Sequence, residues 1–351
     1  MSIFKLTPSF KDYLWGGTKL PQKYNKDTII SPCAESWELS LHPDGESTVA
    51  GKPLSDILTP EILGKNCAQF ESFPMLVKLI DAAQNLSVQV HPSDEYAIKN
   101  ESSYGKTEMW YIVEADESAG IYLGFSEKVT IQDVRDAIAK GNLEELLSFV
   151  PVKAGECYFI PAGTVHAICA GCLICEIQQN SNITYRVYDY CRRDKNGLER
   201  PLHIDRALDV SALTPYTKRS LPKGLLGISK YFTVKKVSVS DACTIPTDSG
   251  SFVGFTVVRG SGQIGVTDIT LGDSVLVGAD EHDFTLTGDM DVLTYEVRKY
   301  GTLTEVNERG VKVSLVNDLG VEVASVIGTD KETARVALLE SAYLGESDLT
   351  L

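Results

Sequence analysis

The sequence predicts a mainly β protein made of two barrel-like domains. Short runs rich in valine, isoleucine, threonine and aromatic residues recur along the chain, and turn-forming residues bound them. The best helical spacing of apolar residues is confined to one segment, residues 130–149, between strand-like runs. The chain of 351 residues is also long enough for two domains with sizeable cores.

The first part of the chain begins with an extended arm. Residues 1–50 hold short apolar pieces broken by glycine and proline, a pattern typical of turns and extended chain. A short helical stretch is expected over residues 54–63, interrupted at Pro60. The strand-like runs 75–80 and 87–90 are joined by a short polar segment, so we expect them to form a hairpin.

Further strands surround a helical insertion. Thr130 and Asp133 resemble the start of a capping box, and apolar residues at helical spacing follow, which predicts the helix over 130–149. This helix belongs to an insertion of about residues 128–149 that we expect to pack on one side of the barrel. A shorter amphipathic helix is expected over 204–212. The other expected strands are 110–114, 120–124, 156–160, 166–168, 173–178 and 184–188.

These elements divide the chain into three parts. Residues 1–220 contain the first barrel, and Pro215 and Pro222 mark a linker. Residues 221–300 alternate β-branched and aromatic residues between glycine turns, which predicts a second barrel. His282 is its only histidine, so we expect this degenerate repeat to bind no metal. Residues 301–351, with a helix expected over 331–343, receive no role.

Four side chains in the first barrel form a pattern that favours one metal site. Gln89 and His91 lie two apart on a β-branched strand, so they point to the same face. Glu108 and His166 arrive on later strands, and the turn Pro161-Ala162-Gly163 directs His166 into the barrel mouth. Imidazole and carboxylate groups that converge from several strands suit a divalent cation. The sequence therefore predicts a mononuclear metal site.

Composition excludes several classes of protein. The net charge of −15 opposes nucleic-acid binding, and an anionic substrate must be held by a few local cations. No run of 18 apolar residues exists, so no membrane span is expected. The missing signal-peptide pattern and only eight cysteines predict a cytoplasmic location. Cys169, Cys172 and Cys175 lack a fourth ligand at suitable spacing and are interpreted as buried apolar residues.

The motifs resemble those of a known family. The turn that leads to His166 is similar to the second motif of the cupin superfamily, whose members form double-stranded β-helix or jelly-roll barrels. Over about residues 1–298, the chain resembles the type I phosphomannose isomerases in their short bacterial form. The matching segments are Trp15-Gly16-Gly17, Glu35-Ser36-Trp37-Glu38, Pro74-Met75-Leu76-Val77-Lys78, Leu86-Ser87-Val88-Gln89-Val90-His91-Pro92, Gly105-Lys106-Thr107-Glu108-Met109-Trp110, Pro161-Ala162-Gly163-Thr164-Val165-His166 and Glu176-Ile177-Gln178-Gln179-Asn180-Ser181-Asn182-Ile183-Thr184-Tyr185-Arg186.

This resemblance implies an enzyme that interconverts mannose 6-phosphate and fructose 6-phosphate through an enediol or enediolate. It implies that one zinc ion, or another divalent ion, is bound by Gln89, His91, Glu108 and His166. It places Glu176 and Arg186 in the catalytic pocket, and Lys106 and Ser87 where substrate hydroxyls or phosphate bind. We expect Glu176 to transfer the proton, with Lys106 as the alternative, and Arg186 to hold an anion. Trp15 is a further candidate for sugar contact.

Other functions remain open at this point. A cupin metal site with two histidines and one carboxylate also suits an iron-dependent dioxygenase, although Gln89 as a fourth ligand argues against it. A different sugar-phosphate isomerase is a second alternative. A non-catalytic sugar-phosphate sensor is a third, but the chain shows no basic recognition helix. We expect the partner to be a small sugar phosphate and the chain to act as a monomer or small homo-oligomer.

Overall fold

The computed structural model forms two compact units and describes residues 2–193, 197–218, 221, 224–307, 310–342, 344–345 and 348–349. The first unit consists of Pro8–Glu46 and Met75–Lys218. The second unit consists of Met1–Thr7, Ser47–Pro74 and Arg219–Leu351. Pro222, in the expected linker, and Tyr343, at the expected end of the last helix, lie outside the described residues.

This division corrects our assignment of residues 1–220 to the first domain. Strand β1 (Ile3–Lys5) pairs with β19 (Ser274–Val277), so the start of the chain completes a sheet of the second unit. The backbone N–H of Asn66 donates to the carbonyl of Gly250 at 2.7 Å, which ties residues 47–74 to the same unit. These pairings join segments far apart in sequence, and local patterns do not reveal them.

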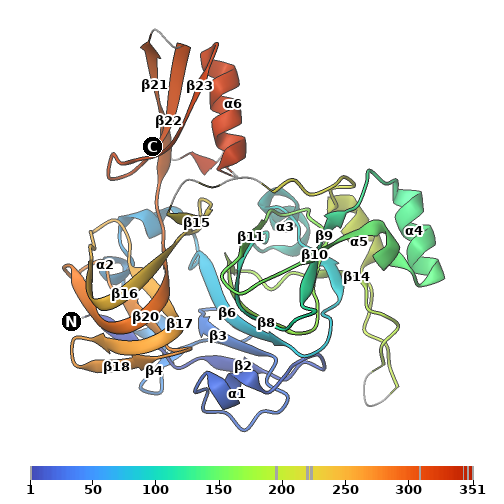
Figure 1. The fold of residues 1–351 in the computed structure, drawn as a ribbon, viewed down its shortest axis with the longest axis horizontal. Helices are drawn as coiled ribbons and strands as arrows, with labels where there is room; N and C mark the ends of the chain where they lie inside the picture. The colour runs from blue at the N-terminus through green and yellow to red at the C-terminus, as the bar shows by residue number, and fades with distance from the viewer. Residues whose placement is uncertain are drawn as a thin grey trace. The chain divides into compact units, whose positions relative to one another are not determined.

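The first unit is built around two antiparallel sheets (Figure 1). The apolar faces of these sheets share one core. Ile80, Trp110 and Ile174 contribute from one sheet, and Ile121 and Leu123 from the other. In spatial order the six-stranded sheet is β11 (Cys157–Ile160), β8 (Glu108–Ala115), β13 (Cys172–Gln179), β6 (Met75–Ala82), β3 (Glu35–Leu39) and β2 (Ser9–Lys11). The five-stranded sheet is β10 (Leu147–Pro151), β9 (Gly120–Phe125), β12 (His166–Ile168), β7 (Val88–Val90) and β14 (Tyr185–Tyr188).

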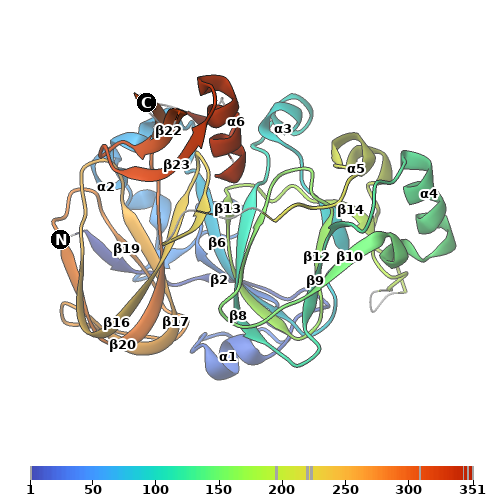
Figure 2. The same ribbon diagram turned by 45° about the horizontal axis from the view of Figure 1, so that its top comes forward.

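Helices cover the outer face of the five-stranded sheet (Figure 2). Val88 and Val90 point outward from β7 and pack in one cluster with Val134 and Ala137 of α4 (Ile131–Lys140) and with Leu208 of α5 (Ile204–Val210). Because alternate side chains of a strand face opposite sides, this packing turns Gln89 toward the barrel interior. The remaining helices of the unit are α1 (Lys19–Lys23), α3 (Asp94–Glu101) and the 3₁₀ turn η3 (Leu143–Leu146).

Two expected elements are corrected here. The helix predicted over 130–149 ends at Lys140, because Gly141 adopts a left-handed φ of 72°, and β10 begins at Leu147. The hairpin predicted for 75–80 and 87–90 does not form. Its first strand lies in β6, between β3 and β13, whereas β7 lies between β12 and β14 in the other sheet. The predicted arm, residues 1–50, also contains the fully buried strand β3.

The capping box at the start of α4 gives a direct test of local stability. The Thr130 hydroxyl accepts a hydrogen bond from the backbone N–H of Asp133, and the Asp133 carboxylate accepts one from the backbone N–H of Thr130. Thr130→Ala should lower the free energy of unfolding by about 1 kcal/mol. Thr18→Ala is the matched control, since Thr18 precedes α1 without a side-chain capping bond. Equal losses in denaturant unfolding for both variants would contradict the assignment.

The second unit contains a larger antiparallel sheet, as the alternating pattern of residues 221–300 predicts. Its core includes Phe255, Val275, Leu286 and Val292. The order is β1, β19, β17 (Val253–Ile264), β20 (Phe284–Glu296), β16 (Thr233–Ile245) and β15 (Leu225–Ile228), with β18 (Thr267–Thr270) paired to β17. The segment 47–74 adds β4 (Thr48–Val49), β5 (Lys52–Pro53), η1 (Leu54–Asp56), α2 (Pro60–Leu63) and η2 (Lys65–Gln69).

Residues beyond 299 form a small sheet with one helix. The antiparallel order is β21 (Tyr300–Asn307), β22 (Gly310–Asn317) and β23 (Glu322–Gly328), and α6 (Lys331–Ser341) packs on β22 and β23. Arg298, just before β21, is buried and pairs with Asp248 at 2.6 Å and Asp318 at 3.5 Å. Among the described residues, no helix is long and apolar enough to cross a bilayer.

Candidate metal centre and cavity

The strand register brings three of the predicted residues side by side. Gln89 on β7 lies opposite His166 on β12 and, across its other edge, opposite Arg186 on β14. Directly opposed residues of an antiparallel ladder share one face of the sheet. Since Val88 and Val90 occupy the outer face, all three side chains belong to the inner face. His91 follows β7, and Glu108 opens β8 in the facing sheet.

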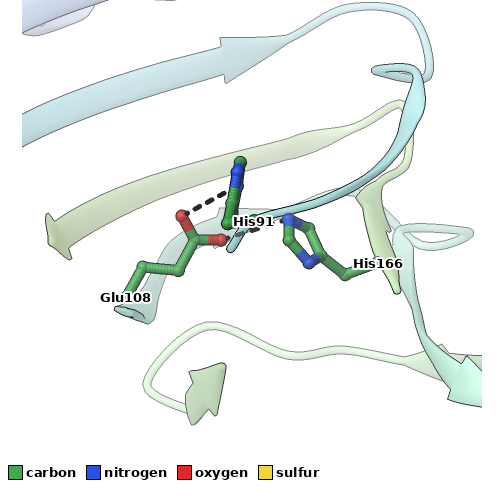
Figure 3. A group of neighbouring side chains, drawn as sticks. All are labelled: His91, Glu108 and His166. Carbon is green, nitrogen blue, oxygen red and sulfur yellow. Dashed lines mark ion pairs between the residues drawn. The ribbon is translucent and has the colours of Figure 1, made fainter. Parts of the chain in front are cut away.

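His91, Glu108 and His166 form a buried cluster (Figure 3). One potential ligand atom from each lies within 4.8 Å of the others, and all three side chains are at most 1% exposed. Glu108 lies between the two imidazoles. Its Oε1 is 3.3 Å from His166 Nε2, and its Oε2 is 3.5 Å from His91 Nε2. The cluster therefore combines one carboxylate with two ring nitrogens inside the protein.

The backbone fixes which nitrogen of each imidazole faces Glu108. His91 Nδ1 lies 2.8 Å from the carbonyl of Ile183, and His166 Nδ1 lies 2.8 Å from the carbonyl of Thr164. A carbonyl only accepts, so each Nδ1 carries a hydrogen and each neutral ring leaves a lone pair on Nε2. Burial lowers the pKa of His166 to about 4 and that of His91 well below 6.5. Both rings are thus neutral near pH 7.

Neutral imidazoles cannot form ion pairs with Glu108. The contacts drawn in Figure 3 therefore join groups that each offer a lone pair, namely Nε2 of His91, Nε2 of His166 and the carboxylate of Glu108. Among the described residues, His91 Nε2 and Glu108 Oε1 have no hydrogen-bond partner. Burial also raises the pKa of Glu108 to about 8, although Lys106 opposes this shift. A divalent cation would satisfy these atoms and stabilise the ionised carboxylate, so the donor set fits a metal. The amide of Gln89 adjoins it, with Nε2 at 3.4 Å from His166 Nε2, and a half-turn of the amide would present oxygen instead.

A network of alternating charges adjoins this cluster. Lys106 Nζ lies 2.9 Å from Glu108 Oε2 and 3.9 Å from Glu176 Oε2, and Lys78 Nζ lies 3.4 Å from the same Glu176 oxygen. Burial alone would raise the pKa of Glu176, but Lys106 and Lys78 outweigh it and hold the pKa well below its usual range. Trp110 Nε1 donates to Glu176 Oε1 at 3.0 Å, which fixes the carboxylate. Glu176 is therefore ionised.

A cavity of about 270 Å³ opens next to the network. Trp15, Ser87, Gln89, Lys106, Glu176 and Arg186, all predicted from the sequence, line it. His91, Glu108 and His166 are buried and are not among its lining residues. The sequence reasoning missed Tyr13, Glu35, Lys78, Asn182, Thr184 and Arg200.

Lys78 was detectable among the missed residues, because it interrupts the otherwise apolar run Met75-Leu76-Val77-Lys78-Leu79-Ile80. A lysine in such a strand requires buried partners. Glu35 Oε2, at 3.6 Å from Lys78 Nζ, is one of them. Arg200 and Asn182 gave no such signal, since they lie in polar segments.

Facing β-sheets that enclose a His-Glu-His cluster are the arrangement of a cupin barrel whose donor set fits a metal ion. The family of the phosphomannose isomerase type I catalytic domain matches residues 3–118, and that of the mannose-6-phosphate isomerase cupin domain matches residues 225–296. The chain is 35% identical to mannose-6-phosphate isomerase of Streptococcus mutans, over 80% of this chain and 93% of that protein. It is also 35% identical to mannose-6-phosphate isomerase ManA of Bacillus subtilis, over 73% and 85%.

Among solved structures, the chain is similar to a Bacillus subtilis mannose 6-phosphate isomerase, with a TM-score of 0.75 and 35% identity over 84% of this chain and 99% of that one. The chain belongs to the type I phosphomannose isomerase family. Members of this family are metal-dependent aldose–ketose isomerases. The small sheet β21–β23 and α6 lie outside both matched domains.

Proposed function

We propose that this chain interconverts mannose 6-phosphate and fructose 6-phosphate with one zinc ion bound by His91, Glu108, His166 and Gln89. The observation that carries the proposal is the buried cluster of two neutral imidazoles and one carboxylate beside a cavity with an ionised glutamate. The names and structures of the relatives support the choice of substrate. Zinc suits two imidazole nitrogens and a carboxylate, although other divalent ions share this ligand set.

The reaction moves one proton between neighbouring carbons of the open-chain sugar. A bound divalent cation would supply positive charge that stabilises the oxyanion of an enediolate. We propose that Glu176 removes the proton from C2 of mannose 6-phosphate and returns it to C1. The proton of the C2 hydroxyl moves to the C1 oxygen, so that C2 becomes the carbonyl carbon of fructose 6-phosphate. A base must be unprotonated, and Lys78 and Lys106 keep Glu176 in that state. Lys106 is the alternative proton carrier.

The remaining lining residues then bind the sugar phosphate. Arg186 is a permanent cation suited to an anion, and Ser87 can hydrogen-bond a sugar hydroxyl. Trp15, which is 4% exposed, offers an apolar wall. We also propose that the protein acts in the cytoplasm. Its eight free cysteines support a reducing environment.

A coupled assay of mannose 6-phosphate conversion tests the proposed function. The purified protein should form fructose 6-phosphate, lose this activity after dialysis against a chelator, and regain it when zinc is added back. The metal content should approach one ion per chain, because the structure supplies one ligand cluster in its described part. Full activity in protein shown to be free of metal would contradict the proposal.

A further inference from the structure

Arginines gather at one part of the cavity wall. Arg186 and Arg200 line the cavity, and Arg192 lies next to them through a shared partner, Asp189. Arg200 donates from Nε to Asp189 Oδ2 at 2.7 Å and from Nη2 to Oδ1 at 2.6 Å. Asp189 is 5% exposed and also accepts from Arg192 Nη2. The Asp189 carboxylate therefore fixes the guanidinium of Arg200, and the same carboxylate also binds Arg192.

Arg186 carries a charge that this carboxylate does not neutralise. Within the described part of the chain, Arg186 forms no ion pair, and its buried Nε lacks a hydrogen-bond partner. Its Nη1 donates to the carbonyl of Pro201 at 2.9 Å, which holds the Arg186 side chain against the segment that carries Arg200. Burial, followed by the neighbouring Arg200, lowers the pKa of Arg186. Asp189 pairs with Arg192 and Arg200, and Arg186 adds a third positive charge, so this wall favours an anion despite the net charge of −15.

The register places this wall at a defined spacing from the candidate metal ligands. Arg186, Gln89 and His166 occupy three neighbouring strands at the same level. Strands lie about 4.8 Å apart, so the backbone of Arg186 is about 10 Å from that of His166. In mannose 6-phosphate the reacting carbons C1 and C2 and the phosphate on C6 are at opposite ends of the carbon chain. A molecule with its reacting end at the metal centre would direct its phosphate to the arginines.

We propose that Arg200, oriented by Asp189, binds the phosphate group of the substrate together with Arg186 and thereby determines specificity for phosphorylated sugars. This inference rests on the proposed function and adds two residues to it. Arg200 is a substrate-contacting residue, whereas Asp189 is a positioning residue that acts through Arg200. Neither residue lies in one of the matching segments quoted above for the family resemblance.

Arg200→Met is the principal test, measured in the zinc-loaded enzyme. The KM for mannose 6-phosphate and the inhibition constant of inorganic phosphate should both rise about 10- to 100-fold, as expected for loss of charged hydrogen bonds. The kcat should stay within about threefold of the wild type, because the phosphate contact is the same in ground and transition states. Arg193→Met is the matched control, since Arg193 pairs with Glu199 and does not line the cavity.

Asp189→Asn separates positioning from net charge. The substitution removes a negative charge beside the cavity, so simple electrostatics would tighten phosphate binding. If the two hydrogen bonds from Arg200 to the Asp189 oxygens determine phosphate affinity, phosphate should bind more weakly to this variant. The KM should then rise with little change in kcat. Asp189→Glu should restore part of the affinity. Melting temperatures of all variants identify any that fail to fold. Arg200→Lys then provides a milder substitution, which keeps the positive charge but loses the paired N–H donors of the guanidinium.

The outcomes distinguish this inference from the proposed function. If the wild type isomerises mannose 6-phosphate and folded Arg200→Met and Arg200→Lys both keep the wild-type KM and phosphate inhibition, the phosphate assignment is overturned and the function stands. Tighter phosphate binding in Asp189→Asn would overturn the positioning role. If the wild type lacks the isomerase activity, the proposed function fails, and binding of inorganic phosphate measured by calorimetry still decides whether Arg200 forms an anion site.

Discussion

Glu108→Gln should abolish metal retention and, with it, isomerase activity. Glu108 supplies the only negative charge within the His-Glu-His cluster, and its two oxygens face both imidazoles. An amide removes that charge and offers a single weaker oxygen ligand, although its volume is nearly the same. Because the site is buried, the lost attraction is poorly replaced by water. Metal analysis after gel filtration should find well below a tenth of an ion per chain.

Glu114→Gln is the control for this experiment. Glu114 lies on the same strand, β8, but pairs near the surface with Lys23 at 3.2 Å and accepts from Tyr24 at 2.8 Å. It should keep its metal and its turnover. Full metal content in Glu108→Gln, checked by thermal unfolding to be folded, would remove Glu108 from the ligand set.

Glu176→Gln should retain near-normal zinc and lose turnover by a factor of about 100 or more. The carboxylate lines the cavity but is not part of the His-Glu-His cluster, so its neutralisation should not release the metal. A glutamine cannot accept the C2 proton, and loss of general acid-base help typically costs this factor. The measurement is kcat in the coupled assay, with metal content determined on the same sample.

Glu38→Gln controls for the loss of a buried ion pair. Glu38 is fully buried on β3 and lies 2.7 Å from Lys26 Nζ, but it does not line the cavity. This variant should unfold at a lower temperature and keep its kcat. If Glu176→Gln turns over at the wild-type rate, the proton transfer passes to Lys106, which also lines the cavity.

Much of the candidate site was predictable because each of its motifs is local. Gln89 and His91 share a face through strand periodicity, and the turn before His166 is written in proline and glycine. The lining positions of Lys106, Glu176 and Arg186 came with the family resemblance. Tyr13, Arg200 and Asp189 were missed because their contacts join segments that are polar and irregular, and no periodicity signals which way such side chains point.

The wrong predictions of secondary structure and strand pairing have a similar origin. The run 130–149 keeps apolar spacing on both sides of Gly141, so only the left-handed backbone at that glycine reveals where the helix stops. The segments 75–80 and 87–90 are adjacent in sequence, which favours a hairpin. In the structure β6 pairs with β13 instead, and β7 pairs with β12. Pairing between distant strands is set by the whole core, and the alternation within one strand does not encode it.

The interleaving of the two units also constrains how this protein is made. During synthesis, Ile3 leaves the ribosome long before Val277, its partner in the sheet of the second unit. The N-terminal strand therefore lacks this partner until residue 277 of the 351 has been translated. By contrast, every residue of the first unit has been synthesised by Lys218, so that unit can begin to fold on the nascent chain before the other is complete.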